Sequence, residues 1–155
     1  MVGRRTLQLT SLDDVIPEVD RLLQGGYRTV GNWSLGQACN HLALAIQGSV
    51  EGFAGAAPWP VRASLGRLMK RRILSRGKMP ERAKLPEEFH PREGLDDRAE
   101  AEALRAAIRL FGQHAGAMAD HPFFGPTLPE EWQQFHTIHA AHHLGFIIPE
   151  PSAAV

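Results

Sequence analysis

Apolar residues recur along most of this chain at intervals of three and four residues, and almost nowhere at the two-residue interval of a β-strand. Side chains at those intervals share one face of an α-helix, so each such segment must bury a stripe against a neighbour. Glycine and proline clusters separate the segments near residues 25–26, 58–60, 80–91 and 122–126. The pattern therefore predicts an all-α fold, an antiparallel bundle of helices.

Five helical segments are expected, and three of them begin at a capping box, a pair of residues three apart that bond each other's backbone. The expected helices cover residues 12–23, 34–53, 62–74, 96–118 and 127–148. The capping pairs are Ser11 with Asp14, Ser34 with Gln37, and Thr127 with Glu130. Residues 76–96 contain three prolines and many charges, which predicts a long surface loop beside the short third helix.

The composition of the 155 residues fits one domain, with the bundle spanning about residues 9–148. Its 17 basic and 17 acidic residues cancel, so the net charge gives no attraction to nucleic acid or to a membrane. No apolar run approaches the roughly 20 residues that span a bilayer, and no signal-peptide core follows the N-terminal arginines. The single cysteine, Cys39, excludes an internal disulfide and fits a reducing compartment. We therefore expect a cytoplasmic protein.

Four of the eight histidines fall within eight residues of the last expected helix. His139 and His143 are four residues apart, so their imidazoles point the same way and can share one metal ion. His142 is the alternative second ligand, because an offset of three also keeps two residues near one face. The competing interpretation is a set of packed histidines that hydrogen-bond one another.

A third ligand must come from another part of the fold, and His41 on the second expected helix is the favoured candidate. Bundles build metal sites from side chains on facing helices, and small residues flank His41 one turn away on either side. An ordinary half-buried histidine is the alternative for this position.

Several segments together resemble the DinB-like (YfiT-like) superfamily, and more closely its branch of unknown function, DUF1569. The matching residues are Trp33-Ser34-x-Gly36-Gln37-x-x-x-His41-Leu42, His121-Pro122-x-Phe124-Gly125, Glu131-Trp132 and His139-x-x-His142-His143-Leu144. The resemblance covers about residues 9–147. It implies a four-helix bundle with an additional short helix and a long basic loop, in which His41, His139 and His143 form a metal triad. Relatives commonly carry glutamine three residues after the last ligand, where this chain has Phe146, so the groups that orient the ligands must differ.

Three neutral imidazoles leave one position of a zinc ion open, which is the arrangement of a catalytic site. The resemblance implies a metal-dependent enzyme for a small-molecule substrate, which activates either a low-molecular-weight thiol, as in an S-transferase, or water, as in a hydrolase. Zinc is the favoured ion, and nickel, iron and manganese are compatible alternatives. A non-catalytic module that binds a metal or a partner is the alternative function, and the resemblance is compatible with a homodimer.

The sequence also offers candidate catalytic residues besides this triad. His121, His136 and His142 are candidate acids or bases. For His121, a loop histidine that caps a turn is the favoured interpretation, and His136 and His142 are alternatively groups that orient the metal ligands. Glu130 and Glu131 are interpreted as first-turn acids that favour the helix dipole.

The candidate substrate-binding residues are one aromatic side chain and three members of a basic run. These are Trp33, Arg62, Arg67 and Arg71. Residues 62–84 hold nine lysines or arginines against one glutamate, a run that can attract an anionic substrate or thiol cofactor or simply form a solvated face. The absence of interleaved aromatic residues argues against nucleic acid as its partner.

Overall fold

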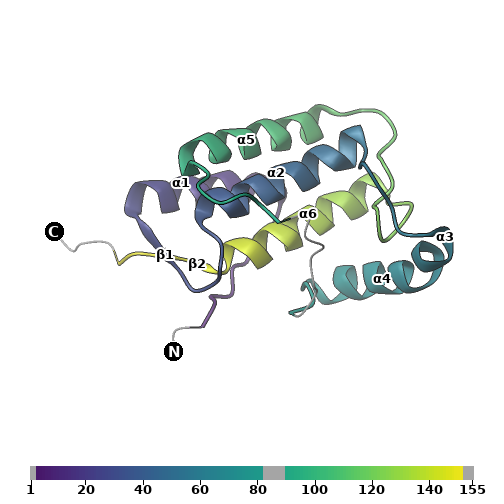
Figure 1. The fold of residues 1–155 in the computed structure, drawn as a ribbon, viewed down its shortest axis with the longest axis horizontal. Helices are drawn as coiled ribbons and strands as arrows, with labels where there is room; N and C mark the ends of the chain where they lie inside the picture. The colour runs from purple at the N-terminus through teal and green to yellow at the C-terminus, as the bar shows by residue number, and fades with distance from the viewer. Residues whose placement is uncertain (1–2, 82–89, 152–155) are drawn as a thin grey trace.

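A computed structural model describes residues 3–81 and 90–151 of the chain, and its elements are labelled in Figure 1. In chain order they are η1 (Leu12–Asp14), α1 (Val15–Gly25), β1 (Tyr27–Thr29), α2 (Leu35–Glu51), α3 (Trp59–Val61), η2 (Arg62–Gly66), α4 (Arg67–Arg76), α5 (Asp97–Gln113), α6 (Pro129–Leu144) and β2 (Ile147–Pro149). The expectation of a predominantly helical fold is confirmed. Within the described part of the chain, no helix is both long enough and apolar enough to cross a bilayer.

Helices α1, α2, α5 and α6 share the larger of two apolar clusters. Their fully buried side chains follow the three- and four-residue spacing of the sequence, because each helix turns one stripe inward. These side chains include Val15, Val19 and Leu22 of α1, Leu35, Cys39, Leu42 and Ile46 of α2, Leu104 of α5, and Leu144 of α6. Helix α2 lies against both α5 and α6 (Figure 1), so its two sides face different neighbours.

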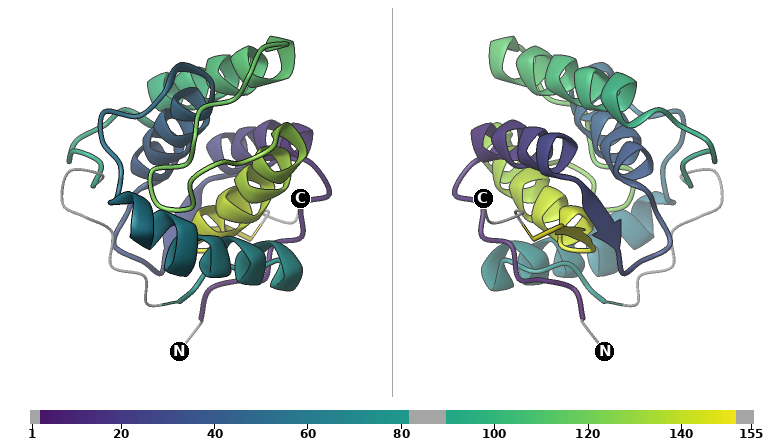
Figure 2. Two further views of the ribbon diagram at one scale, coloured as in Figure 1. Left: turned by 90° about the vertical axis from the view of Figure 1, so that its right-hand side faces the viewer. Right: turned by 90° about the vertical axis from the view of Figure 1, so that its left-hand side faces the viewer.

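A second apolar cluster lies where α4 packs on α6, on the side of the molecule away from α5 (Figures 1 and 2). It joins Ile73 of α4 to Trp132 and Phe135 of α6, and Phe124 of the preceding turn completes it. The indole of Trp132 is fully buried, and its Nε1 donates a hydrogen bond to the carbonyl of Ala119 at 3.0 Å. This cluster fixes the orientation of α6, the helix that carries four of the eight histidines.

The two short strands β1 and β2 pair antiparallel, with Tyr27 opposite Pro149 and Thr29 opposite Ile147. This sheet was not expected, and the prediction that the last helix continues to residue 148 was wrong. Helix α6 ends at Leu144, and the backbone of Gly145 closes its last turn on the carbonyl of Ala141 at 3.1 Å. Strands of three residues are too short for a two-residue alternation to show in the sequence.

The helix starts agree with the expected caps in two places and differ in a third. The Ser34 and Gln37 pair caps α2 in both directions, at 3.1 and 2.9 Å, and the backbone of Ser11 donates to Asp14. Helix α6 instead has Leu128 as its N-cap, one residue after the expected Thr127, because Glu131 accepts the N–H of Leu128 at 2.9 Å. Thr127 donates to the carbonyl of Gly125 and caps nothing.

The third and fourth helices also differ from the expected bounds. The third begins at Trp59, before residue 62, because a proline in the first turn, here Pro60, removes no helical hydrogen bond. Helix α5, the fourth of the expected helices, ends at Gln113 instead of reaching residue 118. Gly112 and Gly116 lie in this stretch. Part of the expected loop, residues 82–89 with two of the nine basic residues, lies outside the described residues.

Candidate metal centre

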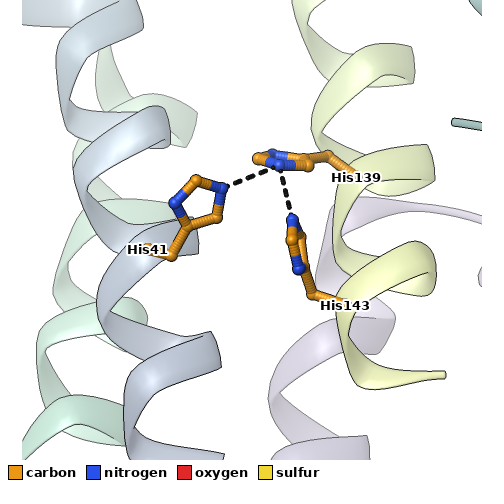
Figure 3. Close-up of side chains that lie close together, drawn as sticks. All are labelled: His41, His139 and His143. Carbon is orange, nitrogen blue, oxygen red and sulfur yellow. Dashed lines mark hydrogen bonds between the residues drawn. The ribbon is translucent and has the colours of Figure 1, made fainter. Parts of the chain in front are cut away.

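Three histidines from two helices converge on one point (Figure 3). His41 projects from α2, and His139 and His143 project from successive turns of α6. The Nε2 of His139 lies 3.1 Å from the Nε2 of His41 and 3.0 Å from the Nε2 of His143. All three residues offer a ligand atom within 4.8 Å of the other two. The structure therefore brings together the histidine of the second helix and the HxxxH pair of the last.

Hydrogen bonds alone satisfy these nitrogens poorly. A ring nitrogen carries either one hydrogen or one lone pair, so the Nε2 of His139 can make one good hydrogen bond and not two. Both neighbours nevertheless approach that same atom. A cation at the meeting point could accept the lone pair of every ring and remove the conflict.

The separations fit a small tetrahedral ion. Nitrogens that each lie about 2.0–2.1 Å from one zinc ion are about 3.3 Å from one another. The observed 3.0 and 3.1 Å need an adjustment of only a few tenths of an ångström. The donor set is also the one found in catalytic zinc sites, three imidazoles with one position left for another ligand.

The electrostatics of the site favour neutral imidazoles. Burial and the neighbouring histidines lower the pKa of His139 well below its ordinary value, and the same causes lower the pKa of His143. Neutral rings keep the lone pairs that a metal ion requires. Within the described residues, however, the Nδ1 of His139 is buried without a hydrogen-bond partner, so the group that commonly orients a ligating imidazole is not seen there.

Aromatic side chains enclose the three imidazoles on two sides. The indole of Trp33 stacks on His143 with ring centroids 4.9 Å apart and 13° between the planes, and it also contacts His41 at 5.0 Å. Phe135 stacks on His139 with ring centroids 5.3 Å apart. Trp33, a candidate for substrate binding, therefore lies directly against the cluster.

One neighbour of the site was not expected from the sequence. The ring of His90, in the loop before α5, lies 6.5 Å from the indole of Trp33 in an edge-on contact. Its position follows only from the tertiary fold, because no helical spacing connects an isolated loop histidine to α2 or α6.

The other histidines of α6 point to different partners. His142 contacts Arg4, with 3.0 Å between its Nδ1 and the guanidinium Nη1, and it stands edge-on to Phe146. His136 lies against Ser49, with 3.0 Å between its Nε2 and the hydroxyl oxygen. The spacing argument left His142 open as a ligand, and the structure brings His143 to the cluster.

His121 forms part of a tight turn within the second apolar cluster. Its Nδ1 accepts the backbone N–H groups of Phe123 and Phe124 at 3.1 and 3.0 Å, and its ring stacks on Phe124 with centroids 3.8 Å apart. Burial, and secondarily the charge of Lys70, lowers the pKa of His121 to about 3. These contacts match the turn-capping interpretation of this residue.

The candidate arginines lie on the α3–α4 stretch, and no described contact joins them to the three histidines. Arg62 forms an ion pair with Asp120 at 3.3 Å, whereas Arg67 and Arg71 are exposed. Glu131 caps α6 and pairs with Lys70 at 2.7 Å, which agrees with its interpretation as a first-turn acid.

The sequence matches one family, described as "Protein of unknown function (DUF1569)", over residues 1–150. No curated protein and no solved structure shows a significant match to the chain. The match covers the three converging histidines and the aromatic residues around them.

Proposed function

The chain belongs to the DUF1569 family of proteins of unknown function, and from that premise we propose that it binds one divalent metal ion, preferably zinc, through His41, His139 and His143. The proposed activity is that of a metal-dependent enzyme acting on a small molecule. The observation that carries the proposal is the approach of two imidazole nitrogens to the Nε2 of His139, at 3.0 and 3.1 Å.

The residues of the chain have separate roles at such a site. The two helices hold the three imidazoles, and burial keeps the rings of His139 and His143 neutral. Trp33 packs against the ring of His143 and Phe135 against that of His139, and we expect both to restrict the approach of water and of a substrate. A bound ion would supply Lewis-acid chemistry, lowering the pKa of a water or thiol and polarising a carbonyl group.

The packing of α1, α2, α5 and α6 supports a finer assignment of the fold. We propose that these helices form a DinB-like four-helix bundle, with α3, η2 and α4 as the additional helical stretch. A histidine on the second long helix and an HxxxH pair on the last follow the order that the resemblance implies. A solved structure of this protein would test the assignment directly.

Two nucleophiles are compatible with the site, a low-molecular-weight thiol and water. Glu130 and Glu131 belong to the first turn of α6, more than a turn before the histidine pair, so neither acid favours one nucleophile over the other. A non-catalytic metal-binding module remains the second candidate function. The unpartnered Nδ1 of His139 favours it, since ligands of catalytic metals are usually oriented by a hydrogen bond.

Cobalt substitution separates these functions. Cobalt(II) in a tetrahedral three-histidine site absorbs visible light, and we expect the parent protein to develop this absorption when cobalt is added. A low-molecular-weight thiol that enters the open position adds a charge-transfer band in the near ultraviolet, whereas an enzyme that activates water gives a pH-dependent visible spectrum without one.

The matched control for this experiment is His142→Ala, which changes a histidine of the same helix outside the cluster and should leave the spectrum intact. His139→Ala should abolish it. A cobalt spectrum that neither thiol nor pH alters supports the non-catalytic module, and the lack of any cobalt spectrum contradicts the metal site itself.

A further inference from the structure

The helical stretch from Trp59 to Arg76, which comprises α3, η2 and α4, has an unusual charge. Residues 59–80 contain seven lysines or arginines and no aspartate or glutamate. The whole chain is neutral, so ten basic and 17 acidic residues remain for the rest of it. The molecule therefore carries a positive stretch and a negative remainder. A negatively charged surface would attract the positive stretch and orient the molecule toward it.

This helical stretch also exposes large apolar side chains. Trp59 is 72 % exposed, Leu65 53 % and Leu68 65 %, whereas Ile73 on the inward side is 2 % exposed. Single exposed hydrophobic residues are common on protein surfaces. Several of them on one helical stretch indicate an interaction site for a protein, a membrane or a ligand. Here they lie among exposed arginines.

Most of the basic residues on the outward side have no acidic partner. Arg62 and Lys70 pair with Asp120 and Glu131. Among the described ion pairs none involves Arg67, Arg71 or Arg72, all of which are exposed. Their charge is therefore available to an external anion. We define the outer face as Trp59, Leu65, Arg67, Leu68, Arg71 and Arg72.

The outer face is an open surface and not an enclosed cavity. A shallow hollow on it is lined by Leu65, Leu68, Met69, Arg71, Arg72 and Ser75. Every one of these residues belongs to the same helical stretch, so the surface is one side of a helix that lies on the α6 side of the molecule (Figure 2). A convex helix side suits a broad partner surface.

We propose that the outer face docks the protein on an anionic lipid surface. Leucine and tryptophan side chains can enter the boundary between headgroups and acyl chains, while the arginines reach the negative headgroups. A second copy of this chain fits poorly, because a two-fold interface would place the arginines of both copies together. An acidic protein would also attract the arginines, but large apolar side chains among exposed arginines are the pattern of a membrane-surface helix. The neutral total charge of the chain conceals this local attraction.

The proposal predicts binding to vesicles that contain an anionic lipid. The probe is the full chain mixed with vesicles of phosphatidylcholine alone, or with about one third phosphatidylglycerol, followed by sedimentation at low and at physiological salt. We expect sedimentation only with the anionic vesicles, and less of it as salt rises. The emission of Trp59 should shift to shorter wavelength on binding, a change that Trp59→Phe removes.

Two sets of variants separate this face from general stickiness. The apolar variant Leu65→Gln with Leu68→Gln, and the charge variant with Arg67, Arg71 and Arg72 each changed to Gln, should each lose about tenfold or more in vesicle binding. The matched apolar control is Leu44→Gln, at a leucine 60 % exposed on α2. The matched charge control changes the exposed Arg28, Arg98 and Arg109 to Gln. Both controls should bind within about twofold of the parent.

Three results would overturn the proposal. The first is a parent protein that stays in solution with anionic vesicles at low salt, a result that needs no variant and no assumption about folding. The second is an equal loss of binding in the controls. The third is tight binding to an acidic polypeptide, such as polyglutamate, without binding to vesicles, which would assign the face to an acidic protein.

Discussion

Gly66, in the helical stretch before α4, lies directly against the backbone of the turn before α6. A Cβ at this position would lie 1.9 Å from the carbonyl oxygen of Phe123 and 2.9 Å from its carbon, whereas side-chain carbons essentially never approach closer than 3.0 Å. The obstacle is backbone, so no side chain can rotate away. The substitution Gly66→Ala therefore requires the helical stretch and the turn to separate by roughly 1 Å.

The expected cost follows from two opposing effects. Alanine in a helix is favoured over glycine by about 0.5–1 kcal/mol. Overpacking costs about 1–3 kcal/mol, and we take the upper end because backbone must move. The net loss in the free energy of unfolding is then about 2 kcal/mol, which lowers the melting temperature by about 4–8 °C in a chain of this size.

Urea denaturation followed by circular dichroism measures this loss, and Gly112→Ala is the matched control. Gly112 lies in α5, where a Cβ meets nothing within 4 Å, so the same substitution should stabilise the protein by about 0.5–1 kcal/mol. A Gly66→Ala variant as stable as the Gly112→Ala variant would refute the described packing of the helical stretch on the 121–125 turn.

Two further predictions concern titration. Burial and the hydrogen bond that Tyr27 donates to Asp97 at 2.5 Å raise the pKa of the phenol to about 12. Since Tyr27 is the single tyrosine, its phenolate absorbance should titrate near pH 12 in the folded protein and near 10 in denaturant, and the associated stability should persist below pH 10 and be lost as pH rises from 10 to 12; a folded midpoint at 10 would contradict this. Burial lowers the pKa of His121 to about 3, so its contribution is complete above pH 6.5 and is lost as pH falls from 6.5 towards 3. His121→Asn, which offers another acceptor to the turn but does not titrate, should reduce the decrease in unfolding free energy measured over that range, and an unchanged decrease would assign it to other groups.

The helices were predictable where local chemistry determines them. The box of Ser34 with Gln37 marks the start of α2 in both sequence and structure, because the capping partners lie three residues apart. The N-cap of α6 was misplaced by one residue. Thr127 was expected to be the cap, but Glu131 accepts the backbone N–H of Leu128 and Pro129 opens the first turn, so the cap is Leu128. Local signals thus located the helices and left the residue at the boundary undecided.

Local spacing within a helix predicted only part of the candidate site. His139 and His143 share a face because they are four residues apart, but their distance to His41 depends on how α2 packs on α6. The prediction that His41 lies beside the pair rested on the resemblance to a family and on the fact that helical bundles often build metal sites between facing helices. The contacts of Trp33 with His143 and His90 involve three separate segments and therefore required the structure.

The small sheet and the N-terminal segment illustrate what sequence spacing does not reveal. The backbone N–H of Arg5 donates to the carbonyl of Gly145, and the side chain of Arg5 donates to the carbonyl of Ile147, so residues at the two ends of the chain hold the last turn of α6. Contacts over more than 130 residues leave no periodic trace, although they support the helix that carries His143.

The central claim is that His41, His139 and His143 hold one metal ion, and metal stoichiometry tests it most directly. The protein is purified without chelator, exposed to zinc, desalted and subjected to elemental analysis beside His41→Ala, His139→Ala, His143→Ala and the control His142→Ala. We predict about one zinc ion per chain in the parent and in the control, and its loss from each of the three folded cluster variants. A parent that retains no zinc, nickel, iron or manganese, or cluster variants that retain it fully, would contradict the account.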